Sequence, residues 1–252
     1  MIKLGVTTRS LNFNGWMNDL SKLEYNTIEI QKKFHKFYLM SDWIKNQRKL
    51  ISNYDLSLHS STTRVFTDNQ QFTRTELEVL RSEIVICSLL GIRQLIFHLK
   101  DIKLTNSELS IIKDIVKFAN NKRVNLIYES NSKFNGIVAL DTLDRIPLLK
   151  YNLDLGHLNL GIKKKLLGMT VDRLFQKLGS RIVYIHVHGN NGIFDQHKSL
   201  SEGNLNWEEI LDLVDLKNVE KIVSETYYPE MDNKNISDIG KYLKKRGIKF
   251  IA

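Results

Sequence analysis

The stretch from residue 185 to 197, IHVHGNNGIFDQH, holds three of the chain's seven histidines and one aspartate. Imidazole and carboxylate together suit Zn²⁺, Mn²⁺, Fe²⁺ or Co²⁺, whereas Mg²⁺ prefers oxygen ligands. His186 and His188 are two residues apart in an apolar run typical of a strand, so both can point to one face. After the GNNG turn, Asp195 and His197 are again two apart and can return to that face. The stretch therefore predicts part of a metal site.

Residues of the same types stand near the ends of other apolar runs. They are His59, His98, Glu129, Asp154 with His157 just beyond it, and Glu225. Singly, a histidine on a strand is more often a hydrogen-bonded core residue, and a carboxylate there is usually a helix cap. Together with the first stretch, however, the set includes every histidine except His35. Because burying several carboxylates without a cation is costly, we expect one to three divalent ions of Zn, Mn, Co or Mg.

The elements that must position these residues follow from hydrophobic periodicity. Apolar runs typical of strands lie at 3–8, 27–31, 56–60, 95–100, 125–130, 151–157, 182–189 and 221–228. Helical periodicity is clearest at 73–91, 107–122, 170–179, 206–216 and 236–247. This alternation predicts an α/β fold, a single (β/α)₈ TIM barrel over residues 1–252, whose chemistry sits at the carboxyl ends of the strands. An open doubly wound sheet is the alternative, but TTRSLNFNG (7–15) lacks a glycine-rich phosphate turn.

The composition of the chain indicates the class of protein and its cellular location. Hydrophobic residues make up 42% and charged residues 26% of the chain, values typical of a globular protein. The lone Cys87 sits in an apolar run and predicts a buried thiol, and no stretch has the length of a signal peptide core or a membrane span. We therefore expect a cytoplasmic protein with no membrane partner. The net charge of +9 favours anionic partners.

Several motifs on consecutive strands, taken in order, resemble one family. They are LSLHS, IFHL, IYESN, LDLGH, IHVHGN, DQHKSLSEGNLNW and VSET. In this order they are similar to the xylose isomerase-like TIM-barrel superfamily, which includes sugar-phosphate isomerases and epimerases and the type IV AP endonucleases (AP endonuclease family 2). The resemblance implies a principal metal site at Glu129, Asp154, His186 and Glu225. It also implies that Glu129 and Glu225 move protons through an enediolate while His157 orients the substrate.

The endonuclease branch of that superfamily uses more ligands, and this chain has counterparts for them. The resemblance implies that His59 and His98 share Glu129 in a second site, and that His157, Asp195 and His197 form a third. Such a cluster of three zinc ions could cleave abasic DNA. Against this alternative, His59 is followed by Ser60-Ser61-Thr62 where the endonucleases typically carry Ala-Pro-Tyr, and Gly189 stands where many relatives carry aspartate.

The first hypothesis is therefore a metal-dependent isomerase or epimerase of a small sugar or sugar phosphate. The trinuclear phosphodiesterase acting on DNA is the second, and a lyase or dehydratase using the same enolising chemistry is the third. Lysines after two strands, Lys163, Lys164 and Lys198, are candidates for binding a substrate phosphate. Because barrels of this kind often dimerise, a homodimer is a further expectation.

Overall fold

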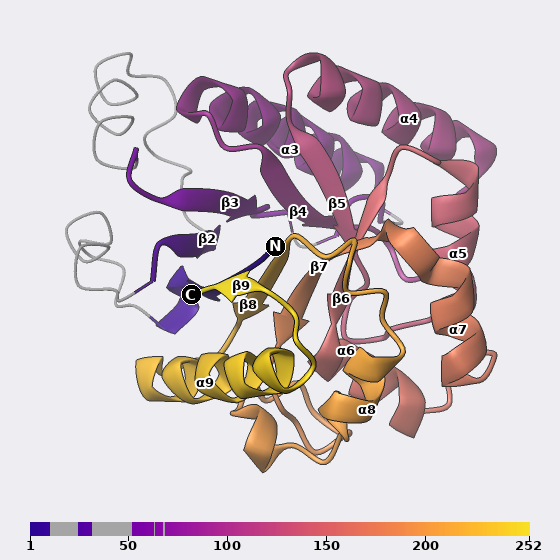
Figure 1. Cartoon of the computed structure of the whole chain (residues 1–252). Coiled ribbons are helices and arrows are strands. Elements are labelled where there is room, and N and C mark those ends of the chain that lie inside the picture. Colours follow the sequence, from indigo (N-terminus) through magenta and orange to yellow (C-terminus); the bar gives the residue numbers. More distant parts are fainter. Residues whose placement is uncertain (11–24, 32–51, 63, 68) are drawn as a thin grey trace.

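The computed structural model describes residues 1–10, 25–31, 52–62, 64–67 and 69–252. Eight parallel strands follow one another in sequence order, and β1 pairs with both β2 and β8, which closes the sheet into a barrel. The predicted TIM barrel is therefore confirmed, and the open sheet is excluded. The strands are β1 Ile2–Thr7, β2 Thr27–Gln31, β3 Asp55–His59, β4 Gln94–His98, β5 Asn125–Glu129, β6 Lys150–Asp154, β7 Ile182–Val187 and β8 Lys221–Ser224 (Figure 1).

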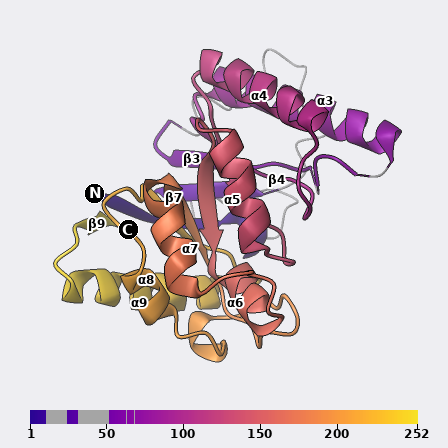
Figure 2. The ribbon, with the colours of Figure 1, turned by 90° about the vertical axis from the view of Figure 1, so that its right-hand side faces the viewer.

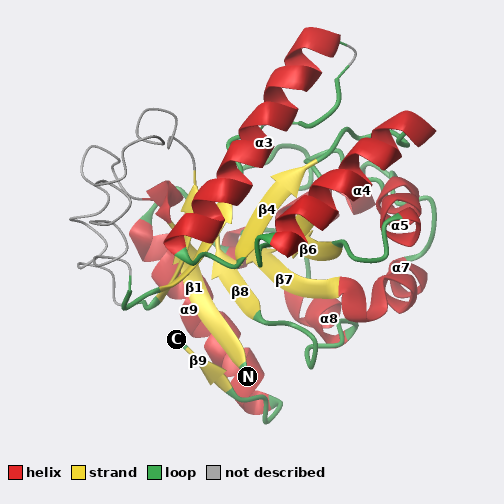
Figure 3. Ribbon diagram, turned by 90° about the horizontal axis from the view of Figure 1, so that it is seen from above, coloured by secondary structure: helices red, strands yellow, loops and turns green. Residues whose placement is uncertain are grey.

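Helices surround the barrel (Figures 1 and 3), and Figure 2 shows α5 and α7 side by side against it. A short ninth strand that the periodicity did not predict, β9 Phe250–Ile251, pairs with the start of β1 and brings the two chain ends together. No helix in the described ranges is long and apolar enough to cross a membrane. The helices are α3 Gln70–Leu90, α4 Asn106–Asn121, α5 Gly136–Arg145, α6 Leu155–Lys163, α7 Val171–Leu178, α8 Trp207–Asp212 and α9 Pro229–Lys245.

Several predicted boundaries were wrong: the eighth strand, expected to reach residue 228, ends at Ser224, and the helix expected at 206–216 spans Trp207–Asp212. Two further differences have a clear local reason. The sixth strand was expected to run to residue 157, but it ends at Asp154, whose side chain caps α6 by accepting a hydrogen bond from His157 N at 2.6 Å. The last helix was expected at 236 but begins at Pro229, because proline suits the first helical position while the polar residues after it show no apolar periodicity.

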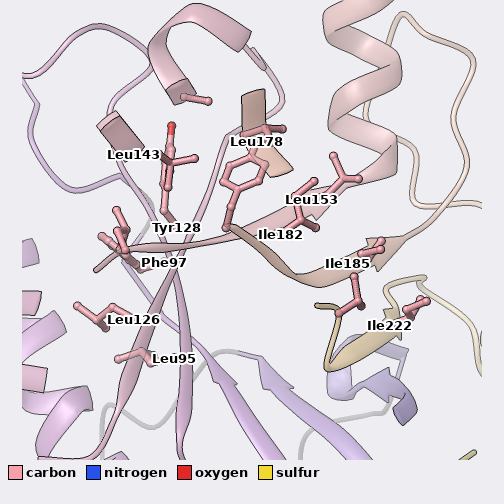
Figure 4. Close-up of a cluster of buried hydrophobic side chains, with 14 of the residues drawn as sticks. Leu95, Phe97, Leu126, Tyr128, Leu143, Leu153, Leu178, Ile182, Ile185 and Ile222 are labelled. Atoms are coloured by element: carbon pink, nitrogen blue, oxygen red, sulfur yellow. The ribbon is translucent and has the colours of Figure 1, made fainter. Parts of the chain in front are cut away.

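The side-chain alternation of the strands separates two apolar layers. The outer layer, between barrel and helices, takes one set of alternate residues, such as Leu95, Phe97, Leu126 and Tyr128 (Figure 4). The inner cluster takes Ile96, Ile127, Tyr184 and Val223 from the other set, and Val183 joins it. Further along the same strands, towards their carboxyl ends, the inward positions change from apolar to ionisable. The barrel thus has an apolar interior with polar residues at one end.

Candidate metal centre

The carboxyl end of the barrel gathers every residue predicted as a metal ligand. Neighbouring donor atoms lie a few ångströms apart. Following the ligand sets that the resemblance implies, we divide them into the first group (Glu129, Asp154, His186 and Glu225), the second group (His59, His98 and Glu129) and the third group (His157, Asp195 and His197). Close sets of donors also cross these groups, such as His188 with Asp195 and His197. Except for the partly exposed Asp195 and His98, all these residues are buried. His35 lies outside the described residues.

The first group converges on one nitrogen. His186 Nδ1 lies 3.1 Å from Glu129 Oε2, 3.4 Å from Glu225 Oε2 and 3.8 Å from Asp154 Oδ2. Nitrogen and oxygen ligands bound about 2.1 Å from a common tetrahedral ion are about 3.4 Å apart. The three distances from His186 Nδ1 are thus compatible with donors that share a single divalent cation.

The second group is oriented by backbone carbonyls. His59 Nδ1 lies 3.2 Å from Ser60 O, and His98 Nδ1 lies 3.1 Å from Glu129 O. A carbonyl only accepts, so each Nδ1 carries the proton and each Nε2 offers its lone pair. Both Nε2 atoms face the Glu129 carboxylate, at 3.5 and 3.9 Å. This use of one ring nitrogen to fix the other is the usual arrangement of metal-binding histidines.

The third group is built in the same way by α6 and the loop after β7. His157 Nδ1 donates to Ser130 O and His197 Nδ1 to Glu225 O, both at 2.8 Å. Each Nε2 lies 3.2 Å from Asp195 Oδ2. The loop is closed by paired backbone hydrogen bonds between Gly189 and Lys198, and His197 takes the left-handed φ of 46°. A backbone conformation rare for a non-glycine residue, at the position of a candidate ligand, is typical of a functional site.

Gly189 explains one departure from the family pattern. A Cβ there would lie 2.2 Å from Ser199 O and 3.0 Å from Gly203 N. The aspartate that many relatives carry at this position would therefore not fit this backbone. Glycine lets the Gly189–Lys198 bridge form, and that bridge returns Asp195 and His197 to the mouth of the barrel.

The buried carboxylates of the cluster shift the pKa values of its histidines and favour a nearby positive charge. Burial lowers the pKa of His59, but Glu129 and the nearby carboxylates outweigh it and raise that pKa to about 9. At His98 burial dominates and lowers the pKa to about 4. Burial alone would raise the pKa of Glu129, yet His186 and His98 hold it well below its ordinary value. Since the carboxylate stays ionised, either protons on histidines or a bound cation must neutralise it.

Residues that sequence reasoning missed complete the site. Glu29 Oε2 accepts a hydrogen bond from His186 Nε2 at 2.8 Å, which leaves Nδ1 for the first group. Gln31 donates to both Glu29 and Glu225. Glu29 and Gln31 alternate with Ile28 and Ile30 in TIEIQ, so their place on the inward face could have been inferred from the period of two.

Two more missed residues come from the 3-10 turn Thr8–Ser10 after β1 and from β6. Arg9 Nη1 donates to Glu225 Oε1 at 2.9 Å, and Asn152 Nδ2 donates to Glu129 Oε2 at 2.7 Å. Each contacts one of the two glutamates predicted to move protons. By contrast, Lys163, Lys164 and Lys198 are exposed. Lys163 lies over Gly192 of the loop, and no ion pair joins the three lysines to the cluster in the ranges that the structure describes.

Comparison with known proteins identifies the family of this chain. The family model described as a xylose isomerase-like TIM barrel matches residues 17–246. The chain belongs to the xylose isomerase-like TIM-barrel family. Two curated relatives in Methanocaldococcus jannaschii are the uncharacterized proteins MJ1311, 25% identical over 54% of this chain and 46% of the relative, and MJ1614, 26% identical over 73% and 70%. The chain thus spans about half the length of the first relative.

Solved structures of the xylose isomerase-like fold superpose over nearly the whole chain. A D-tagatose 3-epimerase-like protein has a TM-score of 0.79 at 20% identity and covers 98% of both chains. D-psicose 3-epimerase in the presence of D-fructose has a TM-score of 0.70 at 15% identity, covering 96% of this chain and 99% of the other. The IOLI protein with a binding zinc atom has a TM-score of 0.69 at 13% identity, covering 98% and 96%. At these identities the likeness shows the shared fold.

Proposed function

We propose that this protein is a metal-dependent isomerase or epimerase of a small sugar or sugar phosphate, which moves a proton at a carbon next to a carbonyl. One observation carries the proposal. Glu129 from β5 and Glu225 from β8 both lie within 3.4 Å of His186 Nδ1. Two ionised carboxylates from well-separated strands thus border one position. The sugar epimerases among the structural neighbours support this class of reaction.

The residues present fit a divalent cation. The donor set of the first group mixes carboxylate and imidazole, its distances from His186 Nδ1 are compatible with a shared ion, and the zinc-bound neighbour supports metal binding in this fold. When bound, such a cation would polarise the carbonyl and stabilise the charge of the enediolate. Mixed nitrogen and oxygen donors favour zinc, manganese or cobalt over magnesium.

The chain's own residues would divide the remaining work. Glu129 and Glu225, from opposite sides of the substrate carbon, would remove a proton and return one. Asn152 and Arg9 hold the two carboxylates through hydrogen bonds of 2.7 and 2.9 Å, which fixes the direction of their free oxygen lone pairs. His157 Nε2 would orient the substrate when the third group holds no ion, and bind the ion when it does.

The proposal is tested by proton exchange. The protein loaded with Mn²⁺ or Co²⁺ would be incubated in D₂O with ketoses and with their phosphates, and deuterium at the carbon next to the carbonyl followed by NMR. We expect exchange with at least one substrate, and a loss of about 10² to 10⁴-fold in Glu225→Gln at equal metal content. A preference for the phosphates would support the predicted role of Lys163, Lys164 and Lys198.

The matched control is Glu108→Gln, the same change in the capping box of α4, away from the cluster. It is expected to leave exchange unchanged. If Glu225→Gln kept its metal and exchanged as fast as the wild type, the assignment of Glu225 as a proton-transfer residue would be wrong. Loss of water from the product would instead identify the lyase or dehydratase.

A second candidate, an endonuclease for abasic DNA, is favoured by the second and third groups, which supply donors for two more ions. The segment after His59 weighs against it. Ser60 Oγ and Ser61 Oγ donate to Glu83 of α3 at 2.5 and 2.6 Å, so this segment is tied to the barrel wall and offers no aromatic side chain. Cleavage of a synthetic abasic duplex, abolished by chelator, would establish this activity; no cleavage at high protein concentration would exclude it.

A further inference from the structure

His188 lies just beyond the end of β7 and belongs to none of the three groups defined above. Its side chain is buried, and its Nε2 lies 3.1 Å from both oxygens of Asp154 and 3.8 Å from Asp195 Oδ1. Its donor atom lies within 4.8 Å of those of Asp195 and His197, and also of those of Asp154 and His157. His188 therefore faces the third group from the side of Asp154.

The hydrogen bonds of this ring differ from those of the other candidate ligands. The rings of His59, His98, His157 and His197 each lie within hydrogen-bond distance of a backbone carbonyl through Nδ1. The buried Nδ1 of His188 has no hydrogen-bond partner among the described residues. His188 therefore lacks the hydrogen bond that orients the other imidazoles, and only the packing of its ring can hold its Nε2 towards the cluster. Here the polar contacts are confined to the nitrogen that faces the cluster.

The backbone is shaped to admit the ring at this place. A Cβ on Gly156 would lie 1.9 Å from His188 Cε1, so the turn between Asp154 and His157 has room for the imidazole only because residue 156 is glycine. On the other side, the His197 ring stacks on His188 with centroids 4.0 Å apart. The imidazole is held between Gly156 and His197, and its Nε2 is directed at the carboxylates.

Resting on the metal centre of the proposed function, we infer that His188 Nε2 is a further ligand of the third group. The group then has four protein donors: His157, His188, Asp195 and His197. Zinc sites with four protein ligands are closed and structural, whereas catalytic sites keep one position open. The ion of the third group would therefore hold the loop after β7 in place and would not bind substrate. This assignment favours sugar chemistry at the first group over a phosphodiesterase that uses three open ions.

The test is metal binding, read without any substrate. Wild type, His188→Ala, Gly156→Ala and Asp195→Asn would be loaded with zinc, dialysed against limiting free zinc and analysed for ions per chain. The ion that is lost in Asp195→Asn is the ion of the third group, because Asp195 belongs to that group alone. We expect His188→Ala to bind that same ion at least tenfold more weakly, and Gly156→Ala to weaken it too, because a methyl group displaces an imidazole that is still present.

The visible spectrum of bound cobalt shows whether the third group leaves a coordination position open. With zinc, which has no visible spectrum, in the first group and Co²⁺ in the third, inorganic phosphate should leave the wild-type visible spectrum unchanged. It should perturb the spectrum of His188→Ala, which has an open position. Val187→Ala is the control. Val187 is the neighbouring buried residue, but it points into the outer apolar layer, so its truncation should lower stability and leave metal binding unchanged.

Unchanged zinc content and affinity in His188→Ala would overturn the inference, as would a wild-type spectrum that already responds to phosphate. These outcomes are separate from those of the proposed function. If no sugar exchanged but His188→Ala lost the ion, the ligand assignment would stand and the sugar chemistry would fail. If exchange depended on Glu225 while His188→Ala bound metal as the wild type does, the sugar chemistry would stand and the ligand assignment would fail.

Discussion

Glu29 is placed to orient a candidate metal ligand. Its carboxylate and the His186 Nε2 atom, 2.8 Å apart, are both fully buried beneath the first group. Because a carboxylate accepts, Nε2 carries the proton and Nδ1 is left as the donor atom to a cation. The pair resembles the carboxylate–histidine–metal arrangement in which the outer partner fixes the ring and raises its basicity.

We predict that Glu29→Gln weakens cobalt binding to the first group about 10 to 100-fold, because a neutral amide accepts a weaker hydrogen bond from Nε2 and makes the ring a poorer donor to the ion. The measurement is Co²⁺ titration followed by visible absorption. Glu220→Gln is the control, since Glu220 accepts a hydrogen bond from Gln94, the residue at the start of β4, far from the cluster. Unchanged cobalt affinity in Glu29→Gln would contradict the positioning role.

Among the elements, α9 carries a buried acid next to the strand that presents Glu225. Asp232 is 2% exposed and accepts hydrogen bonds from Ser224 Oγ at 2.7 Å and Thr226 Oγ1 at 2.8 Å. Burial outweighs these bonds and raises the pKa of Asp232 to about 6 from 3.8. A raised folded-state pKa means that the protonated acid is favoured on folding. Its stabilising effect is complete below pH 3.8 and is lost as the pH rises through 6.

We therefore predict that Asp232→Asn gains stability relative to the wild type as the pH rises. Between pH 5 and pH 8 the relative gain in the free energy of unfolding should be about 1.4 kcal/mol, from the two pKa values. Urea unfolding of both proteins at the two pH values measures it. Equal pH dependence in wild type and variant would show that Asp232 is ionised throughout this range.

At the scale of the whole molecule, the carboxyl end of the barrel holds several buried carboxylates whose charge protonated histidines or a cation would neutralise. Histidine must lose its proton to bind a metal ion. At His59 burial disfavours the charged ring, but the surrounding carboxylates favour it more strongly and raise the pKa to about 9. At His186 burial also lowers the pKa, but Glu29 and Glu129 outweigh burial and raise it. Protons and metal ions therefore compete for the same nitrogens.

We predict that metal binding stabilises the fold, releases protons and strengthens as the pH rises from 6 towards 9. Free metal at 100 times its dissociation constant should add about 2.7 kcal/mol to the free energy of unfolding. Thermal unfolding with and without chelator measures the stabilisation. Calorimetry in buffers of different ionisation enthalpy counts the protons. A melting temperature indifferent to both chelator and added metal would contradict a structural contribution of the ions.

The sequence by itself determined the barrel and the identity of most site residues. The alternation of strand and helix is a local property, and the period of two in each strand states which residues point inward. Since the carboxyl ends of parallel strands meet at one end of a barrel, residues such as Glu129 and His186 could be assigned to one site without coordinates. Glu29 was open to the same reasoning, because TIEIQ shows the alternation plainly.

Only the tertiary structure decided which atoms meet. The Glu29–His186 hydrogen bond joins residues 157 positions apart, and it exists because closing the barrel brings their strands to face one another. The room that Gly156 leaves for His188, and the carbonyls that set each imidazole, depend likewise on the register between neighbouring strands. No local pattern encodes such contacts. The sequence could supply the donor types and their shared face, whereas the grouping of donors around individual ions required the folded barrel.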